Sequence, residues 1–318
     1  VKLDGQTSVK VKVDATQIKG SYDDLETVYV TGKAGFSNLG NETVTITGTG
    51  PTANSATKVD SILKATTGIV TAEVTAASAS DLVANLKNAN AKDALKLTVT
   101  GATAKASDLN ALDGKTSENI TVNATNVTGN IADLTKLYVT NAANFAALGG
   151  ETVTITGTVT AAQANLIANK TTDVVTATIA AGTAKALNDA LTDSTLPVGG
   201  NALKLTVTGT TANAADLNGL DSKTTVAVDA AAIKNIEGSA AAVKAAYDAN
   251  ALETISGLGN ETVDLSKATD ANVSLVKAIN DFTTGVINVS SVATNASVPG
   301  TFKLTDLGDL AGITGLYN

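Results

Sequence analysis

Short runs of β-branched residues alternate with Thr or Lys along the chain, which is the two-residue period of a strand with one buried face. The spacing between runs varies from roughly 16 to 30 residues, within the range of solenoid coils. The predicted strands are Val11–Val13, Thr27–Val30, Thr43–Thr47, Val70–Val74 and Lys96–Thr100, followed by Ile120–Val122, Leu137–Val139, Thr152–Thr156, Val175–Ile179 and Lys204–Thr208.

Ala-rich segments with helical spacing lie between many of these strands. Thr160 and Gln163 have the spacing of a capping box, which predicts a short helix that buries Leu166 and Ile167. Each such segment ends in Gly, Asn or an Asp-rich turn, so one coil reads strand, turn, short helix, turn, strand. The apolar residues expected to share a helix face are Leu82, Val83 and Leu86; Leu109 and Leu112; Leu217 and Leu220; and Val273, Val276 and Ile279.

The chain also repeats itself at a longer period. The sequence Leu-Gly-(Asn/Gly)-Glu-Thr-Val occurs around Glu42 and Glu151, and a third copy lies around Glu261. Self-similarity of this kind indicates a repeat architecture. The matching segments are 11–20 with 120–129, 94–101 with 202–209, and 106–116 with 214–224. They predict long repeats at about 9–117, 118–224 and 225–318.

The order of the elements predicts the fold. A strand that reaches the next strand through a helical crossover must pair with it in parallel, because a tight hairpin cannot contain a helix. A single coil leaves its apolar edge exposed, and stacking on its neighbours completes the core. We therefore expect one continuous, elongated β-solenoid over residues 1–318. It is of α/β type and right-handed, with a parallel β ladder, short helices on the opposite side and coils somewhat like leucine-rich repeats.

Strand-like sequence near both ends of the chain bears on partners. Val9–Val13 and Phe302–Leu304 look like strands that need neighbours, and no obvious polar cap covers them. We therefore expect self-association or contact with further repeats of the same polypeptide. The chain starts at Val1 without an initiator Met or signal peptide, which is typical of a processed chain or a segment of a longer one.

Composition narrows the chemistry. The chain has no Cys, Met, Trp or His, and its 22 basic residues are all Lys. This excludes zinc, haem, iron–sulfur and copper sites of the usual kind, and also Ser–His and Cys–His dyads. A formal charge of −8 argues against a nucleic-acid partner. No apolar run approaches the ~18 residues of a transmembrane segment.

The repeats and the Ala/Thr/Asn/Val/Gly-rich composition resemble the very large repetitive cell-surface proteins of bacteria. Cyanobacterial surface giants, adhesin-like proteins and surface-layer proteins are the nearest kinds. The resemblance covers essentially all 318 residues and is carried by sequences such as 214–225 and 228–233. It implies a structural or adhesive role outside the cell, and it brings no catalytic or ligand-binding residue with it.

Acidic residues recur at the predicted corners of the coils. Carboxylates and turn carbonyls there could hold Ca²⁺, which takes six to eight oxygen ligands. The alternative, which we favour, is that Asp and Asn occupy these corners because their side chains close turns and cap helices, since no Asp-x-Asp-x-Asp or Gly-Gly-x-Gly-x-Asp spacing occurs. The candidate calcium ligands are Glu42, Glu151, Glu261, Asp113 and Asp221. We expect no other cofactor.

Two further kinds of site are conceivable. The Thr-x-Thr strands could align hydroxyls and methyls into an array that orders water or meets ice, but Thr is also a good strand former that solvates an outer face. Ice binding needs uniform coils, and these coils vary in length. Paired carboxylates of the glycosidase type are conceivable among 30 acidic residues. They recur once per repeat, however, whereas an active site is usually unique. We therefore expect no enzyme and no catalytic residues.

The sequence thus predicts an extracellular structural repeat module of a bacterial cell-surface protein, filament or surface layer. It would be non-catalytic and would assemble through stacked coils or end-to-end contacts. The absence of oxidisable Cys, Met and Trp suits a protein exposed to oxygen outside the cell. The alternative is an adhesin-type binding module that presents its sheet face to a glycan, ice or Ca²⁺.

Overall fold

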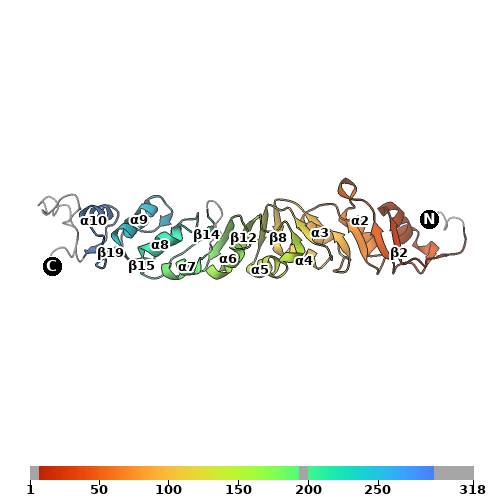
Figure 1. Cartoon of the computed structure of the whole chain (residues 1–318), viewed down its shortest axis with the longest axis horizontal. Helices are drawn as coiled ribbons and strands as arrows, with labels where there is room; N and C mark the ends of the chain where they lie inside the picture. The colour runs from red at the N-terminus through yellow and green to blue at the C-terminus, as the bar shows by residue number, and fades with distance from the viewer. Residues whose placement is uncertain (1–6, 193–199, 290–318) are drawn as a thin grey trace. The chain divides into compact units, whose positions relative to one another are not determined.

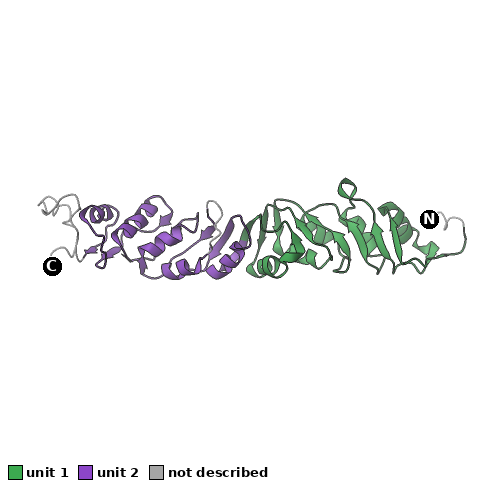
Figure 2. Ribbon diagram, in the orientation of Figure 1, with its two compact units in different colours: residues 1–154 green, residues 155–318 purple. Residues whose placement is uncertain are grey.

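The structure is a computed structural model that describes residues 7–192 and 200–289. It divides into two compact units, residues 1–154 and 155–318, each of which is described by itself (Figure 2). The division falls inside strand β12 (Thr152–Val159) and inside the predicted second long repeat. One continuous solenoid over 1–318 therefore stays a prediction, as do its handedness and its elongated form.

The strands are short and alternate along the chain with helices or helical turns (Figure 1). Those of unit 1 are β1 (Val11–Lys12), β2 (Gln17–Gly20), β3 (Phe36–Ser37), β4 (Thr43–Ile46), β5 (Val70–Glu73), β6 (Ala94–Lys96), β7 (Thr98–Val99), β8 (Thr103–Lys105), β9 (Ile120–Val122), β10 (Asn126–Gly129) and β11 (Phe145–Ala146). Those of unit 2 after β12 are β13 (Val175–Ile179), β14 (Ala202–Lys204), β15 (Thr211–Asn213), β16 (Val228–Asp229), β17 (Asn235–Glu237), β18 (Ile255–Ser256), β19 (Thr262–Leu265) and β20 (Ile287–Val289).

Strand pairing is parallel, as the helical crossovers require. In unit 1 the main sheet has the order β2-β4-β5-β6 and a second sheet has the order β11-β9-β7. In unit 2 the order β15-β17-β19-β20 forms the largest sheet that lies wholly within the unit. The expected α/β class with parallel sheets and short helices is confirmed. The sheets are separate and small.

Strand register aligns apolar side chains in the core. Val44 on β4 pairs with Val70 on β5, and Ala72 on β5 pairs with Leu95 on β6; all four are buried. Thr45 and Thr71, one position along, form a pair on the opposite face. Because side chains of a strand alternate between faces, one face of each strand joins the aliphatic core and the other carries Thr and Lys.

The helices contact one another in chain order within each unit. In unit 1, α1 contacts α2, α2 contacts α3, and so on to α5; in unit 2 the same holds from α6 to α10. Their bounds are α1 (Tyr22–Glu26), α2 (Ala56–Leu63), α3 (Ala79–Asn85), α4 (Ala106–Asp113), α5 (Ile131–Thr135), α6 (Ala161–Ala168), α7 (Ala184–Ala190), α8 (Ala214–Asp221), α9 (Ala240–Ala251) and α10 (Val273–Asn280).

The helix predicted after Thr160 is confirmed in its start and in part of its burial. The capping box of Thr160 and Gln163 opens α6, and Ile167 is fully buried. Leu166, by contrast, is 39% exposed, so its predicted burial was wrong. The reason is that α6 is apolar on several sides and the adjacent position 167 already faces the core.

Two predicted strands are helical instead. Thr27–Val30 lies in a π-helical turn, η2 (Thr27–Thr31), and Leu137–Val139 lies in another, η5 (Lys136–Thr140). Their β-branched residues favour a strand. Helical spacing takes precedence because Tyr29 follows the buried Leu25 of α1 by four residues, which places both on one buried face.

The predicted strand Lys96–Thr100 is broken in two. Its first part ends β6, which pairs with β5, whereas its second part is β7, which pairs with β9 in another sheet. Near the start of the chain, β1 pairs in parallel with β3. The predicted strand Phe302–Leu304 lies outside the described residues. Within 7–192 and 200–289, no helix has the length and apolarity that a membrane span requires.

Candidate functional site

A buried tyrosine–glutamate pair occurs three times in the described chain. Tyr29 donates a hydrogen bond of 3.0 Å to Oε2 of Glu42, and Tyr247 donates one of 3.1 Å to Oε2 of Glu261. Between them, Tyr138 donates a short hydrogen bond to Glu151. The glutamates are 2%, 4% and 0% exposed in chain order. The three predicted calcium ligands of this set therefore face inward, where protein groups contact them.

The loop before each glutamate supplies a second donor. The N–H of Gly40 lies 2.8 Å from Oε2 of Glu42, and the N–H of Gly259 lies within 2.9 Å of both carboxylate oxygens of Glu261. Both glycines have positive φ, 120° and 136°, which L side chains rarely adopt. The Leu-Gly-x-Glu sequence is thus a tight turn that points a backbone N–H at the carboxylate of its own Glu.

These contacts shift the titration of the pair. Burial acts to raise the pKa of Glu42, but hydrogen bonds from backbone N–H groups of the loop and from Tyr29 outweigh it and hold that pKa below its ordinary value. Burial, reinforced by the adjacent glutamate, raises the pKa of Tyr29 and of Tyr138 well above the ordinary value. Burial likewise raises the pKa of Tyr247. In the Tyr29–Glu42 pair the raised pKa of the phenol and the lowered pKa of the carboxyl favour a neutral tyrosine beside a carboxylate at neutral pH.

The three tyrosines lie in helices of two different types. Tyr29 and Tyr138 lie in the π-helical turns η2 and η5, 13 residues before their glutamates. Tyr247 lies in the regular helix α9, 14 residues before Glu261. The same contact is therefore built on two local backbones, which indicates that the side-chain pair itself is what the repeats share.

A threonine of the next coil binds the backbone at the same glutamate. Thr66 donates a hydrogen bond of 3.1 Å to the carbonyl of Glu42, and Thr283 does the same at Glu261. Each threonine oxygen also accepts the N–H two residues on, from Gly68 and Gly285. One hydroxyl therefore both closes its own turn and joins it to the preceding coil.

The same threonine hydrogen bond recurs in other coils, and it was not predicted from the sequence. Thr116 bonds the carbonyl of Leu95, and Thr224 bonds that of Leu203, each at 2.7 Å. The residue that follows, Thr or Ser, also bonds the preceding coil in several copies, as Thr67 does at Gly40. In the sequence, this threonine is the first residue of a Thr-Thr or Thr-Ser pair shortly after a helix, and this recurring pair could have indicated it.

The other two predicted calcium ligands lie at the ends of helices. Asp113 ends α4, and its two carboxylate oxygens accept hydrogen bonds of 2.8 Å from Asn141 and Asn144. Asp221, at the corresponding end of α8, is half-buried. Across residues 7–192 and 200–289, no three acidic side chains gather closely enough to hold a metal ion. Calcium binding stays a prediction without a site.

An Asp and an Asn occupy equivalent positions in the two units and perform the same task. Asp93 accepts the N–H of Val70, and Asn201 accepts the N–H of Val175, each at 2.9 Å and each nearly fully buried. Both bonds cap the start of a strand. Since a neutral amide replaces a carboxylate here, the shared requirement is an acceptor oxygen rather than a charge.

Two hollows lie in the surface of the described residues. One of about 580 Å³ is lined by residues from Val13 to Thr16 and from Asn38 to Glu42. Another of about 320 Å³ in unit 2 lies beside Glu237 on β17 and its register partner Asp264 on β19. Carboxylates line both hollows, and the second is also lined by Ser266 and Lys267.

No family model, curated protein or solved structure matches this chain. The geometry therefore carries the functional argument.

Proposed function

We propose that the chain is a non-catalytic structural repeat module of a bacterial cell-surface protein, filament or surface layer. Its coils would stack into a right-handed solenoid, and it would assemble through end-to-end contacts or through further repeats of the same polypeptide. The observation that carries the proposal is the triple recurrence of the buried tyrosine–glutamate pair, which uses the repeated carboxylates to hold the fold.

Bonds between consecutive coils support this proposal. Besides parallel strand pairing, side chains link a turn to the one before it, as Thr66 links to Glu42 and Lys115 links to the carbonyl of Leu86. A buried polar group that lacks its partner costs free energy, so each such bond favours one register of stacking. A module that carries mechanical or steric load requires this property, whereas a catalyst requires an accessible site.

An edge strand supports assembly. Among residues 7–192 and 200–289, strand β2 is the edge of its sheet and has β4 as its partner. An edge strand presents unpaired N–H and C=O groups that can pair with another strand. That strand would come from another copy or from a neighbouring repeat. The location outside the cell rests on composition, namely the absence of oxidisable Cys, Met and Trp and the formal charge of −8.

Electron microscopy and sedimentation of the purified chain test the assembly. We expect filaments, a lattice or concentration-dependent association. Ile18→Lys, on β2, should weaken the association, whereas Val139→Lys, at a side chain 42% exposed on η5, should leave it unchanged. A strictly monomeric species at high concentration would argue against assembly through the ends. Equal behaviour of the two variants would argue against the β2 edge.

The paired threonines of the outer sheet face favour one alternative, a binding module. Thr45 and Thr71 are register partners on β4 and β5, and Thr98 and Thr121 are partners on β7 and β9. Such columns could meet ice, a glycan or Ca²⁺. Ice-affinity, glycan-array and calcium-dependent melting measurements test this alternative. A positive signal that Thr45→Lys removes would support it, and no signal in all three would end it.

A further inference from the structure

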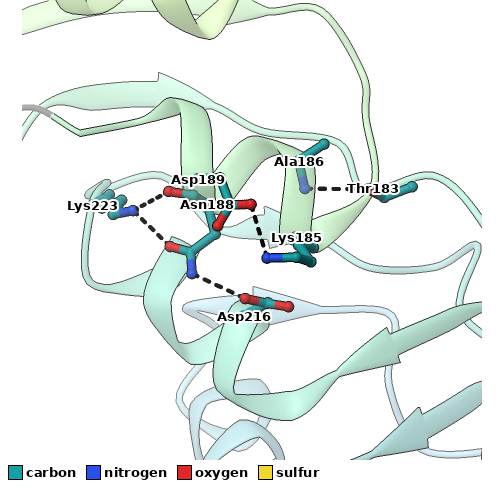
Figure 3. A network of polar contacts seen from close by, with 7 residues as sticks. All are labelled: Thr183, Lys185, Ala186, Asn188, Asp189, Asp216 and Lys223. Atoms are coloured by element: carbon teal, nitrogen blue, oxygen red, sulfur yellow. Dashed lines mark hydrogen bonds and ion pairs between the residues drawn. The ribbon is translucent and has the colours of Figure 1, made fainter.

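Three side chains of unit 2 meet between α7 and α8 (Figure 3). The Nζ of Lys223 lies 2.6 Å from Oδ1 of Asn188 and 2.6 Å from the Asn188 carbonyl oxygen. The Nδ2 of the same Asn188 lies 3.2 Å from Oδ1 of Asp216. An amine thus contacts the oxygen of a carboxamide whose nitrogen contacts a carboxylate.

The surroundings of Lys223 shift the titration of its amine. Burial lowers the pKa of the Lys223 ammonium, and the nearby carboxylates of Asp189 and Asp216 oppose this shift without cancelling it. Asp189 is itself engaged, because Lys185 pairs with it at 2.9 Å (Figure 3). A lysine whose pKa is lowered by burial is more nucleophilic at neutral pH than one in water.

The backbone of α8 leaves room for the carboxamide. A Cβ at Gly219 would lie 2.9 Å from Cγ of Asn188 and closer still to its oxygen and nitrogen. The side chain of Asn188 therefore packs directly against the helix backbone, which restricts its movement. A fixed orientation of this kind is what an intramolecular reaction requires.

We propose that Lys223 and Asn188 join in an isopeptide bond between their side chains. Nζ attacks Cγ of Asn188 and forms a C–N bond, and Nζ loses one proton. Nδ2 takes up one proton and leaves as ammonia with the electron pair of the broken Cγ–Nδ2 bond. Asp216, in contact with Nδ2, takes up the proton that Nζ releases and passes it to Nδ2. No oxidant or other co-reactant is needed.

Unit 1 provides an internal comparison. Repeat alignment places Lys115 at the position of Lys223 and Asp108 at that of Asp216, but Val83 stands in place of Asn188 and Ala111 in place of Gly219. Lys115 bonds the carbonyl of Leu86, the residue that follows α3. The carboxamide and the glycine that makes room for it therefore occur together in unit 2 and are both replaced in unit 1.

The bond would close a loop between α7 and the turn that follows α8, across 35 residues of sequence. It would tie one coil to the next by a covalent bond where unit 1 has hydrogen bonds only. A cross-link of this length restricts the unfolded chain and raises resistance to heat.

Intact-mass spectrometry of the denatured full chain tests the proposal. We expect a mass lower than that of the sequence by one ammonia, and a branched peptide that joins the segments around 188 and 223 after proteolysis. Lys223→Arg keeps the cation but not the nucleophile and should restore the full mass, while Lys115→Arg should keep the loss. Asp216→Asn should slow the reaction.

Two results of the mass measurement would overturn the proposal. A wild-type chain that retains its full mass after prolonged incubation at neutral pH would overturn the proposal, and so would an ammonia loss that persists in Lys223→Arg, since cyclisation of an Asn on its own backbone gives the same mass. The double variant Val83→Asn and Ala111→Gly should lose a second ammonia if the three residues suffice. Circular dichroism establishes that each variant is folded.

Discussion

Tyr29 and Glu42 form a hydrogen bond that is buried on both sides, with the tyrosine 1% and the glutamate 2% exposed. The pair joins the end of a helix to the start of strand β4 on the far side of a loop. A hydrogen bond to a charged group contributes more than one between neutral groups. The two residues therefore fix how the helix, the loop and the strand of one coil are arranged.

Removal of the Tyr29 hydroxyl should destabilise the fold. Tyr29→Phe leaves the carboxylate of Glu42 buried without that donor, and we expect a loss of about 1.5–3 kcal/mol in the free energy of unfolding. Tyr22→Phe is the matched control, because its hydroxyl bonds the partly exposed Glu26 and should cost less. Urea denaturation followed by circular dichroism measures both. Equal losses would contradict a special role for the buried pair.

Alkaline pH should unfold the chain through the three tyrosines. Since the native pKa of Tyr29, Tyr138 and Tyr247 is raised, their contribution to stability is complete below the unfolded pKa of about 10 and is lost as pH rises through the native values. Tyrosinate absorbance should therefore increase together with the loss of circular dichroism. Independent ionisation of these tyrosines near pH 10 in a chain that stays folded would contradict the burial.

Acid should also destabilise the fold, through carboxylates rather than tyrosines. Burial acts to raise the pKa of Asp270, yet the N–H groups of Ala241 and Ala240 at the start of α9 lower it overall. A lowered pKa, as at Glu42, contributes stability above the unfolded values of about 4, and this stability is lost as pH falls through the native values. The melting temperature should fall below about pH 4. It should fall less steeply in Asp270→Asn, which no longer titrates.

Two glycines should tolerate no side chain. A Cβ at Gly68 would collide with the carbonyl of Glu42, and one at Gly285 would collide with that of Glu261. Gly68→Ala should therefore cost about 1–3 kcal/mol, since the coil must separate from its neighbour. Gly114→Ala is the control, because its Cβ would lie 3.6 Å from the nearest atom, the carbonyl oxygen of Ala111. Similar melting temperatures for the two variants would contradict close stacking at Gly68.

The sequence predicted much of the fold because its period is directly visible. Strands such as Thr43–Ile46 and the capped helix α6 follow from alternation and from one capping box. The π-helical turns could not be predicted locally, since Thr-Val-Tyr-Val favours a strand, whereas the burial of Tyr29 beside Leu25 and its bond to Glu42 depend on tertiary contacts. The breaks in the sheets, as between β6 and β7, depend on which neighbour each short strand meets.

The sequence predicted where the three glutamates recur but not that they are buried against a tyrosine. The glutamates at 42, 151 and 261 were found by their recurrence and interpreted as corner carboxylates, because their depth cannot be read from the sequence. A tyrosine recurs at 29, 138 and 247, 13 or 14 residues before each glutamate, and this spacing could have identified it as the partner of the glutamate. Lys223 and Asn188 could not have been paired from sequence, since 35 residues separate them.

Small-angle X-ray scattering of the purified chain tests the central claim most directly. If the coils stack without interruption along the chain, we expect the scattering profile of a single stiff rod with one cross-section. This profile should be the same at every salt concentration. A profile of two bodies that move independently, or of one compact sphere, would contradict a continuous stack of coils.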